Sequence, residues 1–437
     1  MLQKERVKKV LIISYYWPPA GGVGVLRSLK IAKYLRRFGW EPVVFAPLNA
    51  DYPHLDERNS KDIPENLEVI RFPVWEPFKL FKIFTGRGKE DSSNPVYARE
   101  KKVKLVDDLA IWIRGNFFIP DARFMWIRPS VKFLKKYLAK NPVDAIFTDG
   151  PPHTNTVIGL RLSKDLAIPW LADFQDPWTQ VDYYKMFKIS RWADKKHKKL
   201  EQQVFNAARK ITIASPSWAK DLESIGARSV EVLYYGYDED DFRNLKQTID
   251  TDFTIVHAGL LGYDRNPDVL FQVLKDLKNK LPGFSEKLKL NFAGNIDYIV
   301  RKHIADNNLT ENLNDLGFIK REKALELTLN GQLLLLPLNK AKNVKGRIPG
   351  KLYENLRAKR PILCLGPQDS DVATILRETG AGKSIDYEDY AELKDFIAGR
   401  YELFLKNQNE VSTKNYERFS NENQTEFLSR LLNQMVS

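Results

Sequence analysis

Cysteine is almost absent from this sequence: one residue of 437, Cys364, carries a thiol. A single thiol can form neither an internal disulfide nor a zinc site built from several cysteines. Cys364 lies in the apolar stretch 361–365, which predicts a buried structural thiol. Disulfide-stapled folds and cysteine-rich zinc modules are therefore excluded.

Long hydrophobic runs are also missing. Purely apolar runs such as Leu333 to Leu336 and Val10 to Ile13 are far shorter than the roughly 20 residues of a membrane-spanning helix. The N-terminus has a basic start and a short apolar run, but Tyr15 to Pro19 follows it without a small-residue cleavage site. We therefore predict a first β-strand and a loop there, and a cytoplasmic protein.

Acidic residues are outnumbered, 56 against 69 basic ones, which gives a net charge of +13. An excess of this sign favours nucleic acid, anionic lipid headgroups or phosphorylated substrates as partners. Basic residues cluster at 195–199 and 132–140, where solvated helix faces are the simplest interpretation. No nucleic-acid-binding module accompanies them, so we expect no nucleic acid partner.

Short apolar or β-branched runs alternate with helical patterns along nearly the whole chain. This alternation predicts an α/β protein with two doubly wound, Rossmann-like parallel sheets. The strands predicted for the first sheet are 9–15, 42–46, 67–72, 143–148, 169–173, 210–214 and 229–233. Those predicted for the second are 253–257, 287–293, 332–336, 361–365 and 382–385.

The polar stretch that follows Tyr235 marks the natural boundary between the two domains. We predict an N-terminal domain over 1–240, a C-terminal domain over 251–405 and a terminal amphipathic segment over 406–437. Its apolar side is expected to pack back onto the N-terminal domain. Residues 73–123 have the least regular pattern and are interpreted as an insertion.

Ligands of parallel sheets bind at the carboxyl ends of the strands, which draws attention to the loops there. The first strand is followed by a loop containing Gly21 and Gly22 and then by a helix that carries Arg27. Glycines allow close approach of a ligand, and a helix N-terminus offers N–H groups to an anion. The loop lacks the third glycine of a dinucleotide fingerprint and the Gly-Lys-Ser/Thr of a P-loop.

Several ordered segments resemble the GT-B glycosyltransferases of family four, which are bacterial, use nucleotide sugars and retain the anomeric configuration. The resemblance is carried by segments 15–22, 29–39, 149–154, 173–178, 236–242, 259–267 and 350–361. It implies a hexosyl- or N-acetylhexosaminyltransferase of surface-polysaccharide biosynthesis. The first domain would bind the acceptor and the second the nucleotide-sugar donor.

Two positions depart from the family pattern. The donor helix of the family carries two glutamates; Glu354 matches the second, but Gly346 stands where the first would be. Gln175 stands where an arginine is expected between Asp173 and Asp176. The identity of the donor sugar therefore cannot be carried over from the family.

The resemblance and the chemistry of the reaction together select the donor residues. The departing diphosphate needs positive charge, and Arg265 and Lys351 are the cations best placed to supply it. Surface salt bridges are the alternative for both. The donor site is expected to consist of Gly22, Gly259, Arg265, Gly350, Lys351, Leu352 and Glu354, with Glu354 on the ribose hydroxyls.

For the acceptor, we expect contacts from Gly21, Asp173 and Asp176, which lie in matched loops, and from Arg27 in the helix after the first loop. His153 is expected to touch the transferring sugar and to act with Arg265 and Lys351 in catalysis; a structural histidine is the alternative. The two aspartates could orient an acceptor hydroxyl or cap the following turn.

The same-face mechanism implied by the family lets the leaving phosphate take the acceptor proton. No Asp-x-Asp element lies in a suitable loop, so we expect neither a metal ion nor another cofactor. The partners expected are a nucleotide sugar, a sugar or lipid-linked oligosaccharide acceptor, and an anionic membrane surface. Aromatic and basic residues at 78–84 and 112–118 suggest peripheral attachment at the inner face of the cell membrane, unless they are buried.

Two other readings stay open. A nicotinamide-dependent oxidoreductase would share the sheets, but it needs an intact glycine fingerprint and an acidic ribose ligand after the second strand. A catalytically silent sugar-nucleotide-binding relative is the other, because such a protein could lack the first glutamate of the donor helix, as this sequence does at Gly346.

Overall fold

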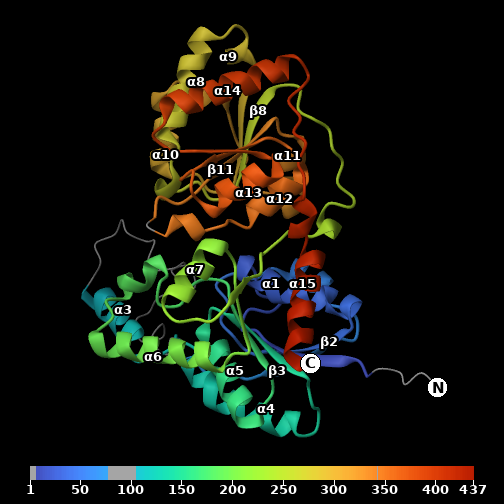
Figure 1. The fold of residues 1–437 in the computed structure, drawn as a ribbon. Coiled ribbons are helices and arrows are strands. Elements are labelled where there is room, and N and C mark those ends of the chain that lie inside the picture. The colour runs from blue at the N-terminus through green and yellow to red at the C-terminus, as the bar shows by residue number, and fades with distance from the viewer. Residues whose placement is uncertain (1–5, 77–104, 342) are drawn as a thin grey trace, which may run out of the picture. The chain divides into compact units, whose positions relative to one another are not determined.

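A computed structural model describes residues 6–76, 105–341 and 343–437 of the protein. The chain forms two compact α/β units (Figure 1). The first contains the residues up to Tyr234 and the segment Asn421–Ser437, and the second is Tyr235–Ser420. These limits differ from the predicted ones in three places: the first unit ends at Tyr234 and not at 240, the second begins at Tyr235 and not at 251, and residues 406–420 group with the second unit.

The first unit contains a seven-stranded parallel sheet in the order β3-β2-β1-β4-β5-β6-β7. Its strands are β1 Lys8–Ile13, β2 Trp40–Pro47, β3 Glu68–Phe72, β4 Ala145–Gly150, β5 Trp170–Phe174, β6 Lys210–Ile213 and β7 Val230–Val232. Its helices are α1 Val23–Tyr34, α3 Leu105–Phe117, α4 Ile127–Leu138, α5 His153–Leu166, α6 Arg191–Ala207, α7 Pro216–Ser224 and α15 Asn421–Val436. The predicted strands are confirmed. Helix α3 lies in the segment interpreted as an irregular insertion, and the aromatic stretch 78–84 lies outside the described residues.

Alternate residues of β1 enter two different cores, because successive side chains of a strand point to opposite faces of the sheet. Leu11 and Ile13 join the core that α4, α5, α6 and α7 cover. Val10 and Ile12 join the core that α1 and α15 cover. Continuous apolar strands of this kind are typical of parallel sheets buried on both faces.

The C-terminal helix α15 belongs to the first unit and packs against α1 (Figure 1). Its apolar residues Leu428, Leu431, Leu432 and Met435 are buried in the same core as β1. The spacing of three and four residues places them on one face of the helix. The last helix of the chain therefore completes the core of the unit in which the chain begins.

The second unit contains a six-stranded parallel sheet in the order β10-β9-β8-β11-β12-β13. Its strands are β8 Phe253–Ala258, β9 Leu288–Ala293, β10 Leu313–Asp315, β11 Leu333–Pro337, β12 Ile362–Leu365 and β13 Gly382–Ile385. Its helices are α8 Asp268–Lys280, α9 Phe284–Lys287, α10 Tyr298–Asp306, α11 Arg321–Asn330, α12 Lys351–Ala358, α13 Asp371–Thr379 and α14 Tyr390–Leu405. Edge strand β10 is not among the predicted strands, because only one of its three residues is apolar.

The strand order reverses once in each sheet, between β1 and β4 in the first unit and between β8 and β11 in the second. In open α/β sheets the crevice outside the carboxyl ends of the strands at such a switch point is where ligands bind. The loops after β1, β4, β8 and β11 are therefore the places to look for a site. Within the described ranges, none of the helices is long and apolar enough to cross a membrane.

Candidate functional site

Two glycines, Gly259 after β8 and Gly294 after β9, allow close packing of the backbone near the switch point of the second unit. The amide of Gly259 donates to the carbonyl of Ala293 (2.7 Å), and that of Gly294 donates to Gly317 (2.6 Å). A β-carbon on Gly294, whose φ is 112°, would lie 2.3 Å from the carbonyl oxygen of Gly259. Only glycine fits there, so the two loops can approach each other closely.

Lys351, the first residue of α12, reaches this glycine loop. A β-carbon on Gly259 would lie 2.8 Å from Lys351 Cε and 3.3 Å from its Nζ. Lys351 is exposed to solvent, yet protein atoms surround it densely enough for desolvation to lower the pKa of its ammonium; Glu354 opposes this effect and Arg321 adds to it. An accessible but poorly solvated cation at a helix N-terminus is well suited to bind an anion.

Glu354 lies one turn further along α12 and forms an ion pair with Arg321 of α11 (2.7 Å). Arg321 also contacts Asp241 Oδ2 at 3.0 Å. Burial opposes the charge of Arg321, but the two carboxylates outweigh it and hold the pKa of Arg321 above its ordinary value. The arrangement fixes the Glu354 carboxylate beside Lys351.

His257, near the end of β8, adds an acceptor to this cluster. Its Nδ1 lies 3.0 Å from the carbonyl oxygen of Leu335, so Nδ1 carries the proton and Nε2 has a lone pair. Nε2 is buried, has no hydrogen-bond partner among the described residues, and lies 3.4 Å from where a β-carbon on Gly259 would be. Burial lowers the pKa of His257 to about 4, so the ring is neutral at pH 7.

This shift predicts a pH dependence of stability. Because the pKa of His257 is about 4 in the folded state and 6.5 without burial, the unfolded state binds more protons between these values. Stability from neutral His257 is complete above pH 6.5 and is lost as the pH falls towards 4. In a His257→Asn variant, whose amide can still donate to Leu335, denaturant unfolding should lose about 2 kcal/mol less than wild type between pH 7.5 and 5. Equal losses would show that His257 is not held neutral.

The remaining predicted donor residues occupy different surroundings. Arg265 Nε lies 3.3 Å from Asp264 Oδ1, with its side chain a quarter exposed. Gly350 precedes α12 directly. Leu352 is fully buried and its amide donates to Pro349, so its contacts are structural. The structure thus brings Gly259, Lys351, Glu354 and Arg265 into the loops of one switch point, with Leu352 beneath them.

In the first unit, the glycines after β1 shape the start of α1. Gly22 precedes the first residue of α1 with φ 90°, a conformation that favours glycine, and a β-carbon there would meet no atom within 4 Å. The Gly21 amide donates to the carbonyl of His54 (2.8 Å). Gly22 therefore presents open space, whereas Gly21 is tied to the neighbouring loop.

Arg27 and Asp173, both predicted to contact an acceptor, form a buried ion pair with each other. Arg27 Nε lies 2.5 Å from Asp173 Oδ2, and its Nη2 donates to Asp173 Oδ1 (2.7 Å) and to the carbonyl of Leu233 (2.7 Å). Thr212 also donates to Asp173 (2.6 Å). The pair links α1 to β5 and β6, and neither side chain reaches the surface. In place of the predicted contact with an acceptor, the structure shows a fold-stabilising pair.

Asp149 lies beside this pair at the end of β4 and is also buried. It accepts from Ser28 (2.5 Å), Ser14 (3.2 Å) and Gln175. Burial and the nearby charge of Asp173 raise the pKa of Asp149 to about 6. Gln175, the residue that departs from the family pattern, therefore serves as a neutral partner of a buried carboxyl. Asp176 follows it in the chain and is partly exposed.

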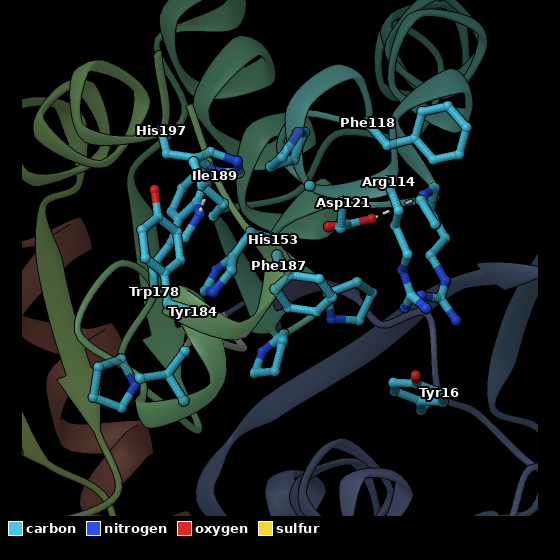
Figure 2. Close-up of a pocket in the computed structure, with 18 residues that line it drawn as sticks. Tyr16, Arg114, Phe118, Asp121, His153, Trp178, Tyr184, Phe187, Ile189 and His197 are labelled. Atoms are coloured by element: carbon cyan, nitrogen blue, oxygen red, sulfur yellow. Dashed lines mark hydrogen bonds between the residues drawn. The ribbon is translucent and has the colours of Figure 1, made fainter. Parts of the chain in front are cut away.

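His153 lies in a cavity of about 280 Å³ in the first unit (Figure 2). Its ring stacks on Trp178 with 4.3 Å between centroids and 6° between planes. Trp178 in turn donates to His197 Nδ1 at 3.1 Å. Burial lowers the pKa of His153 to about 3, and the positive charge that His197 can carry adds to this effect. A neutral His153 can donate one hydrogen bond and accept another, but it does not supply a cation.

Figure 2 shows Arg114, Asp121 and Tyr16 on one side of His153, and Trp178, Tyr184 and His197 on the other. Both carboxylate oxygens of Asp121 are used at the start of α5, where Thr154 donates to them through its amide and hydroxyl (2.8 Å each). Asp121 is therefore a helix cap. The pocket combines aromatic walls with the guanidinium groups of Arg114 and Arg123.

Sequence reasoning missed several residues of both sites. The pattern around His257 predicts an ordinary buried strand, although a histidine two residues before a strand-end glycine is a usable signal. Arg321 meets Glu354 and Asp241 only through the fold, and Arg123 meets Glu76 (3.6 Å) in the same way, so neither arginine carries such a signal. Trp178 lies in a loop that the resemblance had already marked.

No protein-family model matches the sequence, and no curated protein matches it. Solved structures do. Sucrose-phosphate synthase from Thermosynechococcus elongatus is 13% identical, with 98% of each chain covered and a TM-score of 0.61. HepE from Anabaena, solved with UDP and glucose, is 13% identical over 98% of this chain and all of the other, with a TM-score of 0.58. UDP-GlcNAc 2-epimerase from Methanocaldococcus jannaschii is 14% identical over 98% and 99% of the chains, with a TM-score of 0.50.

At such low identity, structural similarity establishes the fold and leaves the reaction open. The first two of these proteins are GT-B glycosyltransferases. Two parallel α/β sheets, each with one switch point, match that architecture. The chain therefore has the GT-B fold of two Rossmann-like domains.

Proposed function

We propose that the protein is a glycosyltransferase that moves a hexosyl or N-acetylhexosaminyl group from a nucleoside diphosphate sugar to an acceptor, with retention and without a metal ion. The observation that carries this proposal is Lys351: a solvent-accessible but poorly solvated cation that meets the Gly259 loop at the switch point of the second sheet. That HepE was solved with UDP and glucose in the same fold supports a nucleotide-sugar donor.

In the proposed reaction, the bond between the anomeric carbon and the β-phosphate oxygen breaks and an acceptor oxygen bonds to the same face of the sugar. The acceptor proton passes to the leaving phosphate, so no separate base is needed. Lys351 and Arg265 stabilise the negative charge that develops on the diphosphate. Glu354, oriented by Arg321, accepts hydrogen bonds from the ribose hydroxyls.

The acceptor is proposed to bind the first unit, in the pocket around His153 and Trp178. Aromatic walls suit the apolar faces of sugar rings, and Arg114 and Arg123 suit an anionic group. A sugar or lipid-linked oligosaccharide acceptor fits this chemistry. The contact of His153 with the transferring sugar stays a prediction.

Nucleotide binding is the first test of this proposal. UDP or GDP at 100 times its dissociation constant should add about 2.7 kcal/mol to stability, because it binds only the folded protein. For a unit of this size, the melting temperature should rise by about 5–10 °C. NAD and NADP should produce no shift. A flat response to UDP, GDP, ADP and dTDP would contradict the assignment of the donor site, and a shift with NAD alone would favour an oxidoreductase.

Metal independence is a second prediction. It rests on the expectation that no Asp-x-Asp element lies in a suitable loop, and on the two cations proposed to take the place of a metal at the diphosphate. Adding about 5–10 mM EDTA to a transfer assay should leave kcat unchanged. This amount of chelator is enough to remove Mg²⁺ and Mn²⁺ from sites built of oxygen ligands. Loss of turnover with EDTA and recovery with Mg²⁺ or Mn²⁺ would overturn it.

A catalytically silent sugar-nucleotide-binding protein is the second candidate, because Gly346 removes one carboxylate of the family's donor helix. Both candidates predict the thermal shift. They differ in turnover, so release of nucleoside diphosphate from its sugar in the presence of acceptor separates them.

A further inference from the structure

Positive charge is concentrated on three neighbouring helices of the first unit. Helices α4, α5 and α6 together contain eleven basic residues and three acidic ones, an excess of eight, whereas the whole chain has a net charge of +13. Helix α5 packs against α4 and α6, and all three cover the same face of the sheet. Their outer surfaces therefore form one basic face.

A groove between α4 and α5 illustrates this charge. It is lined by five cations and a single carboxylate, namely Arg128, Lys132, Lys135, Lys136, Arg161 and Asp165. Lys135 forms an ion pair with Asp165 (3.1 Å). Both side chains of this pair are almost half exposed, so the attraction is screened by water. The groove thus has an uncompensated positive charge.

An exposed aromatic cluster continues the basic face where α3 packs on α6. Trp112, Phe117 and Trp192 are 39%, 56% and 53% exposed. The rings of Trp112 and Phe117 lie 5.7 Å apart, and those of Phe117 and Trp192 lie 6.4 Å apart. Lys196 Nζ lies 3.7 Å from the Trp192 ring centroid. Single exposed apolar residues are common, but three large rings in contact form a patch.

The same helices that carry the cluster also line the acceptor pocket. Arg114 and Gly115 of α3 and His197 of α6 face the pocket, whereas Trp112, Phe117 and Trp192 of these helices are exposed. A surface that engages the cluster would therefore lie next to the pocket.

We propose that the outer faces of α4, α5 and α6, together with the Trp112–Phe117–Trp192 cluster, dock the protein on an anionic lipid bilayer. Tryptophan and phenylalanine insert at the headgroup level, and lysine and arginine bind anionic headgroups. Docking does not depend on the transfer reaction. If the proposed function is correct, it also delivers a lipid-linked acceptor to the pocket.

The geometry favours a bilayer over single-stranded nucleic acid. Bases stack on flat, separately accessible aromatic faces. Here the interplanar angles are 72° and 52°, so each ring packs partly against its neighbour and the three form a compact apolar knob. In a membrane interface, such a group of rings can enter the apolar region while the surrounding lysines and arginines stay at the headgroups.

Vesicle flotation of the full-length protein tests this docking surface. Vesicles of phosphatidylglycerol and phosphatidylcholine (1:1) should bind wild type, and phosphatidylcholine vesicles should not. Combining Lys195→Gln, Lys196→Gln and Lys199→Gln should lower the partition coefficient about 100-fold, at about fivefold for each cation near the surface. Combining Trp112→Ser, Phe117→Ser and Trp192→Ser should lower it at least tenfold.

Matched controls come from exposed residues of the second unit. Combining Lys302→Gln, Lys320→Gln and Lys406→Gln removes the same charge, and Phe318→Ser removes a ring that is 90% exposed. These variants should bind vesicles within about threefold of wild type, because single contacts outside the docking face contribute little. The lysine variants should keep the wild-type melting temperature, and all variants should keep the nucleotide shift, so failure of docking and failure of the donor site remain distinguishable.

Three results would overturn the proposal: no flotation of wild type with anionic vesicles, equal losses in the docking and control variants, or flotation that the docking variants leave unchanged. Tighter binding of a 30-nucleotide single-stranded DNA than of anionic vesicles, lost in the docking variants, would assign the surface to nucleic acid instead.

Discussion

Replacing Lys351 with methionine should lower kcat/KM for sugar transfer by about 100- to 1,000-fold, the typical cost of removing one group that stabilises developing charge. Methionine keeps most of the length of the side chain but removes the ammonium that meets the Gly259 loop. Nucleoside diphosphate affinity should fall about tenfold or more, because a charge-assisted hydrogen bond is lost. Steady-state kinetics and titration calorimetry measure the two effects.

Stability separates this role from a structural one. Lys351 is exposed and poorly solvated, so its loss should change the free energy of unfolding by only about 0.5 kcal/mol. The matched control is Lys383→Met, which removes a half-exposed lysine at the start of β13, the opposite end of the sheet from the site. Unchanged turnover in the Lys351→Met protein would refute the electrostatic role. So would a loss of turnover that is explained by a comparable loss of folded protein.

Replacing Leu432 with aspartate should destabilise the first unit by about 4 kcal/mol or more. Leu432 is fully buried in the core that α15 shares with α1 and β1. The change removes apolar contacts and buries a carboxylate without a partner, and both effects are among the largest that a point mutation can have. In a unit of this size, the melting temperature should fall by about 10 °C.

Nucleotide binding to the second unit serves as the internal control for the melting measurement. A ligand of the second unit should still raise the transition of that unit in the Leu432→Asp protein, because α15 belongs to the first unit. Gln434→Asp adds the same charge at an exposed position of α15 and should leave both transitions in place. If Leu432→Asp melted like wild type, α15 would be a dispensable appendage.

The fold could be predicted from the sequence because its parallel strands are continuous apolar runs. Val10 to Ile13 and Leu333 to Leu336 are buried on both faces of their sheets and carry a strong pattern. The three-residue edge strand β10 lacks this pattern, since Asn314 and Asp315 are exposed. The sequence signal therefore fails where a strand has no core to enter.

The candidate site of the second unit could be predicted in part for a related reason. Glycines at strand ends and a lysine at a helix start are local features, so Gly259 and Lys351 were identifiable without the fold. The partner of Glu354 was not, because Arg321 lies on a different helix and its ion pair depends on how α11 packs against α12.

The acceptor side shows the opposite error. Arg27 lies in the first turns of α1 and Asp173 near the end of β5, where ligands of such sheets bind, but the fold pairs them with each other in the interior. Residue type and position do not distinguish the two roles, because a charged residue at a strand end can contact a ligand or form an internal ion pair equally well. His153 has a neutral ring stacked on Trp178, and only the fold reveals this environment.

We expect the second unit to bind a nucleoside diphosphate between the Gly259 loop and the start of α12. A crystal structure with UDP or GDP, whichever gives the larger thermal shift, tests it most directly. Diphosphate oxygens should lie within hydrogen-bond distance, about 2.7–3.2 Å, of Lys351 Nζ, and the ribose hydroxyls should donate to Glu354. A nucleotide bound elsewhere, with Lys351 and Glu354 making no contact to it, would show that this loop and helix are not the donor site.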